Sequence, residues 1–81
     1  MNTAEAARQT LTKSNIRNGG GPFDRCHTGM GIEHAGWMLT EIGLGNITGE
    51  KAHRWLGYAQ AIVVNFGYLS LYDCKNINHA A

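Results

Sequence analysis

The sequence predicts an all-α fold in which residues of about 31–43 and 49–66 form an antiparallel helical hairpin. A short C-terminal helix at 71–78 and a weak N-terminal helix complete the prediction. Two observations support this fold class. Apolar residues recur with the 3.6-residue period of a helix in two long segments, and glycine-rich breaks separate the segments.

The N-terminal segment 3–14 contains good helix formers, with Thr3 placed to cap the helix and Glu5 in its first turn. Its apolar anchors are few: Ala6, Ala7 and Leu11. Because most helical stability in proteins comes from packing of an apolar face, we expect this helix to be short or frayed.

The strongest break in the sequence is the segment 15–24, which holds three consecutive glycines and the only proline. This composition is typical of a linker or a mobile loop. We therefore divide the chain into two parts. Residues 1–25 are an N-terminal helix with a Gly-rich flexible segment, and residues 26–81 are the helical hairpin domain.

The first hairpin helix carries its apolar residues on one stripe, at Ile32, Ala35, Met38, Leu39 and Ile42. Thr28 is a candidate N-cap, although the glycines that follow it favour a later start near Gly31. Gly43 and Gly45 can supply positive φ angles, so we expect the helix to end there and the chain to reverse direction.

The second hairpin helix shows the clearest pattern in the sequence. Its apolar residues recur at helical spacing, at Ala52, Trp55, Leu56, Ala59, Ile62, Val63 and Phe66. Thr48 is expected to cap this helix and Gly67 to end it. Ser70, with Asp73 three residues later, resembles a capping box and predicts the start of the last helix.

Size, charge and cysteine content limit the classes of protein. The core of an 81-residue domain supplies only about 3–5 kcal/mol of net stability, so we expect a homo-oligomer in which a second copy adds buried surface.

The net charge of +1 disfavours nucleic-acid binding. The longest apolar run, residues 61–64, is far shorter than the ~20 residues that cross a membrane. Cys26 and Cys74 indicate free thiols and a cytoplasmic protein.

Two runs near the C-terminus form a further pattern. HRWLGYAQ (residues 53–60) places a basic-Trp-Leu-Gly-aromatic-x-Gln motif at the start of a helix, and GYLSLYDCK (residues 67–75) follows it. In these runs the sequence resembles small accessory proteins encoded in phage and prophage genomes. The resemblance implies an anti-defence protein in the host cytoplasm. Such a protein would bind a host protein stoichiometrically or sequester a small anionic signal such as a nucleotide.

The start of the second hairpin helix is a candidate anion-binding site. Lys51, His53 and Arg54 lie in its first turns, where free backbone N–H groups favour a negative charge. The alternative is a solvated polar face on which Arg54 pairs with Glu50 four residues earlier.

Aromatic residues beside this helix start are candidate platforms for a nucleotide base. Trp37 and Tyr58 fall near the edges of the apolar stripes, where a base or a partner side chain could stack on them. Trp55 lies on the stripe itself, so we expect it to fill the core.

The Gly-rich run 19–31 offers a second hypothesis for anion binding, through Arg25, His27 and main-chain amides. Its spacing matches neither the dinucleotide fingerprint nor the Walker loop, and the alternative is a flexible hinge. His27 and His34 would lie ~10 Å apart on a helix, too far to share one zinc ion. Cys26 and His27 would point about 100° apart, which is poor geometry for activating a thiolate.

These considerations predict a binding protein without a catalytic centre, a metal or a cofactor. The predicted ligand-binding residues are Arg25, His27, Trp37, Lys51, His53, Arg54 and Tyr58. The alternative is a structural or regulatory protein–protein interaction module that has no ligand pocket.

Overall fold

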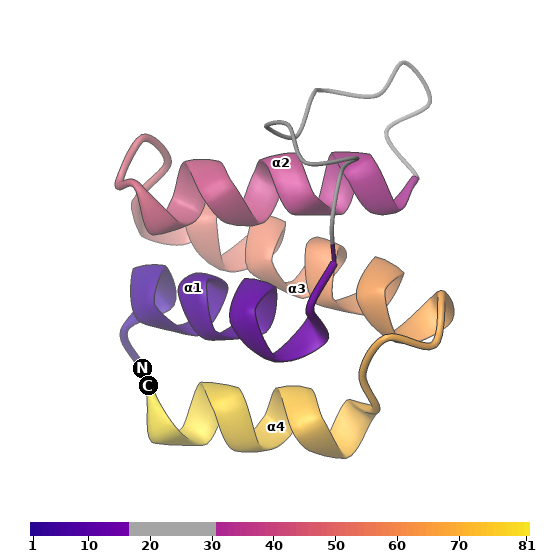
Figure 1. Cartoon of the computed structure of the whole chain (residues 1–81). Coiled ribbons are helices and arrows are strands. Elements are labelled where there is room, and N and C mark those ends of the chain that lie inside the picture. Colours follow the sequence, from indigo (N-terminus) through magenta and orange to yellow (C-terminus); the bar gives the residue numbers. More distant parts are fainter. Residues whose placement is uncertain (17–30) are drawn as a thin grey trace.

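The computed structural model describes residues 1–16 and 31–81, and all regular structure within these residues is helical (Figure 1). Its helices are α1 (Thr3–Ser14), α2 (Ile32–Gly43), α3 (Gly49–Asn65) and α4 (Leu71–Ala80). The all-α prediction is therefore confirmed. No described helix is long and apolar enough to cross a membrane.

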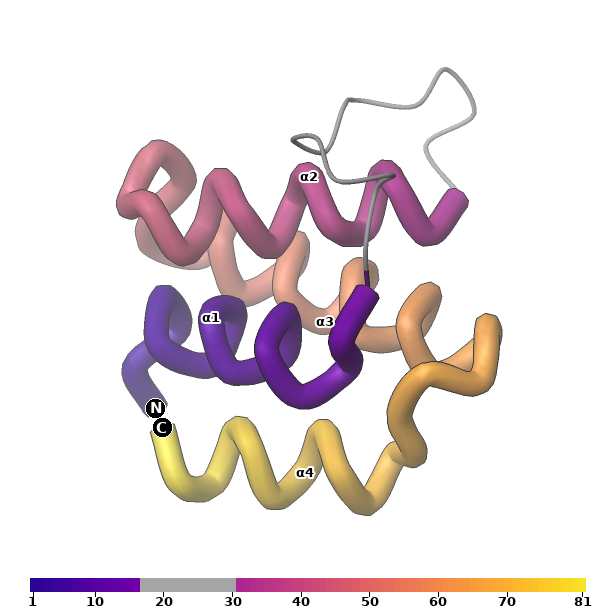
Figure 2. Tube along the Cα trace, in the orientation of Figure 1, coloured from indigo at the N-terminus to yellow at the C-terminus, as the bar shows by residue number. Residues whose placement is uncertain are grey.

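The helices surround one core. Figure 1 shows α1 between α2 and α4, with α3 behind α1 and α2. α1 contacts each of the other three helices, and α2 also packs against α3. Figure 2 shows that the two ends of the chain lie side by side, where the Asn2 N–H donates to the Ala81 carbonyl over 2.9 Å.

Apolar side chains from all four helices form the core. They are Ala6, Ala7, Ala35, Met38, Leu39, Ile42, Ala52, Leu56, Ala59, Ile62, Val63 and Ile77. The members from α2 and α3 lie on the two apolar stripes that the sequence predicts. The larger half-buried side chains, Trp37 and Trp55 among them, pack around this core.

The prediction of a short or frayed N-terminal helix is wrong, because α1 has 12 residues and lies in the centre of the packing. Ala6, Ala7 and Thr10 on its inner face are fully buried. Small side chains let neighbouring helices approach closely, so a helix with few large apolar residues can still be central. The N-cap is Asn2 and not Thr3: its side chain accepts a hydrogen bond from the Glu5 N–H at 3.0 Å.

The predicted ends of the other helices agree closely with the structure. Thr48 is the N-cap residue of α3, although its side chain makes no capping hydrogen bond. Gly67 has a φ of 82° and follows the end of α3. Ser70 and Asp73 form the predicted capping box at the start of α4, with hydrogen bonds of 2.9 and 3.0 Å. The candidate cap Thr28 lies outside the described residues.

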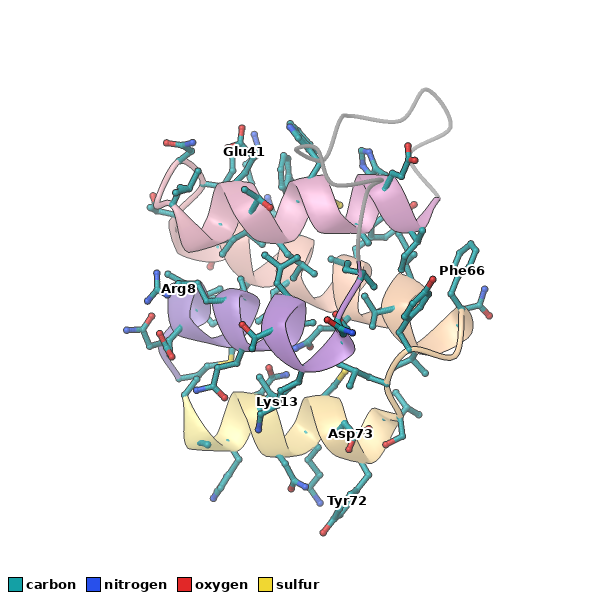
Figure 3. The ribbon with its side chains drawn as sticks, viewed as in Figure 1. Arg8, Lys13, Glu41, Phe66, Tyr72 and Asp73 are labelled. Atoms are coloured by element: carbon teal, nitrogen blue, oxygen red, sulfur yellow. The ribbon has the colours of Figure 1, made fainter. Side chains whose placement is uncertain are left out.

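Phe66 is not a core residue. It is the C-cap residue of α3 and is 52% exposed. Figure 3 shows its ring at the outer end of α3, pointing away from the molecule. The helical period places Phe66 on the stripe, but the helix ends one residue earlier, so the period no longer fixes the direction of its side chain.

Candidate functional site

The predicted anion site at the start of α3 is divided between two flanks of the helix. The Lys51 amine lies 5.3 Å from the centre of the Trp55 ring. The His53 ring shares a 3.3 Å hydrogen bond between its Nε2 and the Thr3 Oγ1 of α1. Residues two apart on a helix point to different sides, so the structure does not bring Lys51 and His53 together.

Arg54 is exposed on the outer surface of α3. Its predicted ion pair with Glu50 is not formed, because within residues 1–16 and 31–81 the single ion pair joins Glu5 and Arg8. Arg54 follows Lys51 by three residues, so the two cations occupy neighbouring positions on the helix surface.

Four side chains form a continuous row across α2 and α3, which we call the aromatic row: His34, Trp37, Trp55 and Lys51. The rings of His34 and Trp37 are 5.5 Å apart between centroids and are tilted by 35°. Those of Trp37 and Trp55 are 5.4 Å apart and tilted by 43°. Such distances are favourable for aromatic pairs.

The aromatic row connects two helices and also limits what can stack on it. His34 and Trp37 are three residues apart, and Lys51 and Trp55 are four apart, so each pair shares a helix face. Both tryptophan rings already have a neighbour in the row. A planar ligand could reach Trp55 once the exposed Lys51 side chain moves off its ring. The sequence singled out Trp37 and Lys51 but did not predict their connection through Trp55.

The remaining predicted site residues are placed as follows. Tyr58 lies on α3 and is partly exposed. Arg25 and His27 lie outside the described residues. Within the described part of the chain, no three His, Cys, Asp or Glu side chains gather in a way that could hold a metal ion.

A second feature was not predicted: large apolar side chains are exposed where α3 gives way to α4. We call this segment the apolar turn, and its members are Phe66, Tyr68, Leu71 and Tyr72, which are 52, 45, 74 and 69% exposed. Figure 3 shows Phe66 and Tyr72 directed outward at its two ends. The helical period contained part of this signal, because Tyr72 lies nearly opposite the buried Cys74 and Ile77 on α4.

A third feature, which we call the polar junction, joins α1, α3 and α4 through the buried Thr10 and Gln60 and the half-buried Asn78. The carboxamides of Gln60 and Asn78 exchange two hydrogen bonds of 2.8 and 3.0 Å. The Gln60 amide also donates to the Thr10 Oγ1 at 3.1 Å, and the Thr10 hydroxyl donates to the Ala6 carbonyl at 2.7 Å. Among the described residues, no buried side-chain nitrogen or oxygen lacks a hydrogen-bond partner.

Two titratable groups on α4, Asp73 and Cys74, have shifted pKa values. Hydrogen bonds from the backbone and the side chain of Ser70 lower the pKa of Asp73 below its ordinary value. Burial raises the pKa of the Cys74 thiol, and the neighbouring Asp73 charge adds to this effect. A raised pKa keeps Cys74 in the thiol form at neutral pH, which argues against a nucleophilic role.

Comparison with protein-family models, with curated proteins and with solved structures finds no match to this chain.

Proposed function

We propose that this chain acts by binding a protein partner and that the apolar turn makes the contact. One observation carries the proposal. Of the seven large apolar side chains exposed within the described residues, four belong to the segment 66–72. Three of these are aromatic, and aromatic residues are enriched at protein interfaces because they bury a large area at a small entropic cost.

The charge around the apolar turn supports a protein surface as the partner. Asp73 and Lys75 lie beside the turn in α4 and carry opposite charges, and the net charge of the chain is only +1. Binding to the phosphate backbone of a nucleic acid needs an excess of cations, which this surface does not offer. An apolar contact with a polar rim is typical of interfaces between proteins.

Two earlier predictions each favour a kind of partner. The resemblance to phage accessory proteins favours a host protein that is bound stoichiometrically rather than a substrate that is converted. The small core favours a second copy of the chain, which would pack against the first through the apolar turn as a homo-oligomer.

A matched pair of variants tests the role of the apolar turn. Leu71 lies in the turn and is 74% exposed, whereas Leu44 lies between α2 and α3 and is 71% exposed. We expect Leu71→Ser to weaken self-association or partner binding about tenfold, because it removes an apolar contact worth ~1–2 kcal/mol. Leu44→Ser should leave both unchanged.

Sedimentation velocity measures self-association, and photo-crosslinkers placed at position 71 or 44 detect a partner in extracts. Crosslinking from position 71 alone, lost on competition with unmodified protein, supports the proposal. Equal crosslinking from both positions, or a monomer that crosslinks from neither, contradicts it.

A small anionic ligand is a second candidate, favoured by the exposed Lys51 amine beside Trp55, whose ring also lies against Trp37. A nucleotide base would replace Lys51 on the indole, and Lys51 and Arg54 would then pair with phosphate. We expect Lys51→Ala and Arg54→Ala to weaken binding of cyclic or linear nucleotides in calorimetry with little loss of stability. Calorimetry that detects no heat with any nucleotide contradicts this candidate and does not affect the first.

A further inference from the structure

We propose that α4 undocks from α1 and α3 as a unit while the other three helices stay folded. The inference is independent of the proposed function, because it rests on how α4 is held. Local unfolding of this kind occurs where few apolar contacts anchor an element.

The apolar anchor of α4 is small. Two of its side chains are buried, Cys74 and Ile77, whereas α2 buries five residues and α3 buries six. Its main packing partner is α1, whose inner face consists of small side chains. The apolar area that opposes undocking of α4 is therefore much smaller than the area that holds α2 and α3 together.

The polar contacts of α4 can be exchanged for water at low cost. Its hydrogen bonds to the rest of the chain include the reciprocal pair of Asn78 with Gln60 and the bond from the Asn2 N–H to Ala81. When α4 moves away, Gln60 becomes exposed and water replaces its lost partner. Undocking therefore leaves no polar group both buried and unpaired, which is the costly state.

The N-terminus of α4 is stabilised within α4 itself. Ser70 and Asp73 satisfy each other's backbone N–H groups, so the capping box moves with the helix and does not depend on α1 or α3. The connection to α3 passes through Gly67, whose φ of 82° and open surroundings suit a hinge.

Undocking changes two surfaces at once. It separates Tyr72, which lies on α4, from Phe66, which lies at the end of α3, and so it alters the apolar turn. It also uncovers Cys74, Ile77 and the polar junction. A partner with higher affinity for the undocked form would shift the population toward that form.

Cys74 provides the measurement, because its thiol is buried only while α4 is docked. In a Cys26→Ser background it is the single thiol of the chain. The rate of thiol labelling under native conditions reports undocking of α4, and hydrogen exchange of the amides in the centre of α3 reports global unfolding. We expect the protection factor of the Cys74 thiol against labelling to be at least tenfold smaller than the protection factor of those amides against exchange. We also expect the labelling rate to depend less on urea concentration than the exchange rate does.

Two pairs of comparisons separate undocking from global unfolding. Asn78→Ala should accelerate Cys74 labelling about three- to tenfold by removing the pair with Gln60, whereas Asn76→Ala, at an exposed position on the same helix, should not. Ile42→Val in the core of α2 should accelerate exchange of the α3 amides about three- to tenfold and leave Cys74 labelling unchanged.

The opposite pattern overturns the inference. If Cys74 labelling and α3 exchange show the same protection and the same urea dependence, α4 leaves only when the whole molecule unfolds. Equal acceleration of both by Ile42→Val leads to the same conclusion.

Discussion

The polar junction shows how single residues position a whole helix. Gln60 is buried on α3 between apolar neighbours, and it reaches Thr10 on α1 and Asn78 on α4. A buried carboxamide costs free energy unless its donors and acceptors are paired, and here they are paired. The amide pair therefore specifies the position of α4 along α3, in addition to the contribution of Ile77.

Replacing Gln60 with leucine tests this role. Gln60→Leu deprives Asn78 and Thr10 of a partner, so we expect the free energy of unfolding to fall by ~1–3 kcal/mol. The double variant Gln60→Leu, Asn78→Leu should lose less than the sum of the single variants, because replacing both partners leaves fewer unpaired groups. Urea denaturation followed by circular dichroism measures each value, and strict additivity would argue against a coupled pair.

The sequence could not reveal the polar junction. Thr10 and Gln60 are 50 residues apart, and neither belongs to a motif that requires the other. A glutamine on an apolar stripe indicates that some buried partner exists, but only the packing of α1 and α4 shows which one. The sequence could not reveal the whole aromatic row either. Its local pairs lie within one helix, but the contact of Trp37 with Trp55 joins two helices and depends on how they pack.

At the scale of elements, the ends of the helices follow from local chemistry. The capping box of α4 and the positive φ of Gly67 are both properties of a few neighbouring residues. For that reason the sequence predicted the ends of α2, α3 and α4 closely. The sequence did not predict that α1 is central to the packing. Alanine and threonine give only a weak indication of burial, and whether they are buried in α1 depends on helices that come later in the chain.

Two glycines with equal free space should respond in opposite ways to substitution by alanine. Gly57 lies inside α3 and Gly67 after its end, and an added Cβ would meet nothing within 4 Å at either position. Gly57→Ala should stabilise the protein by ~0.5–1 kcal/mol, because alanine is the better helix former. Gly67→Ala should destabilise it by about 1 kcal/mol or more, because its φ of 82° strains a residue with a Cβ.

Thermal unfolding of the two variants beside the parent chain measures this difference. A rise in the melting temperature for Gly57→Ala with a fall for Gly67→Ala is the expected result. A fall for both would mean that Gly57 is needed for a close contact, as would occur if another molecule packs on that exposed face of α3.

At the scale of the whole molecule, stability depends on pH through carboxylates at two helix starts. A hydrogen bond from Arg8, with a weaker one from Gln9, lowers the pKa of Glu5, and hydrogen bonds from Ser70 lower the pKa of Asp73. A lowered pKa in the folded state means that the unfolded chain binds protons first as the pH falls. These groups therefore favour the folded state at neutral pH and cease to do so in acid.

We expect the urea midpoint to fall as the pH drops below the ordinary pKa values of 4.5 for Glu5 and 3.8 for Asp73, and to continue falling through their lower folded values. The double variant Glu5→Gln, Asp73→Asn removes both titrations, so its midpoint should depend less on pH over this range. The same acid dependence in the parent and in the variant would show that other carboxyl groups control the acid side.

The contact between Trp37 and Trp55 also gives the chain an intrinsic spectroscopic probe. These are the only two tryptophans, and their indoles lie 5.4 Å apart on different helices. At this separation their strong far-ultraviolet transitions couple, so an exciton signal in the circular dichroism and the emission of the pair report whether α2 and α3 are packed together. The packing of α2 against α3 can thus be followed by intrinsic tryptophan spectroscopy, without attaching a dye.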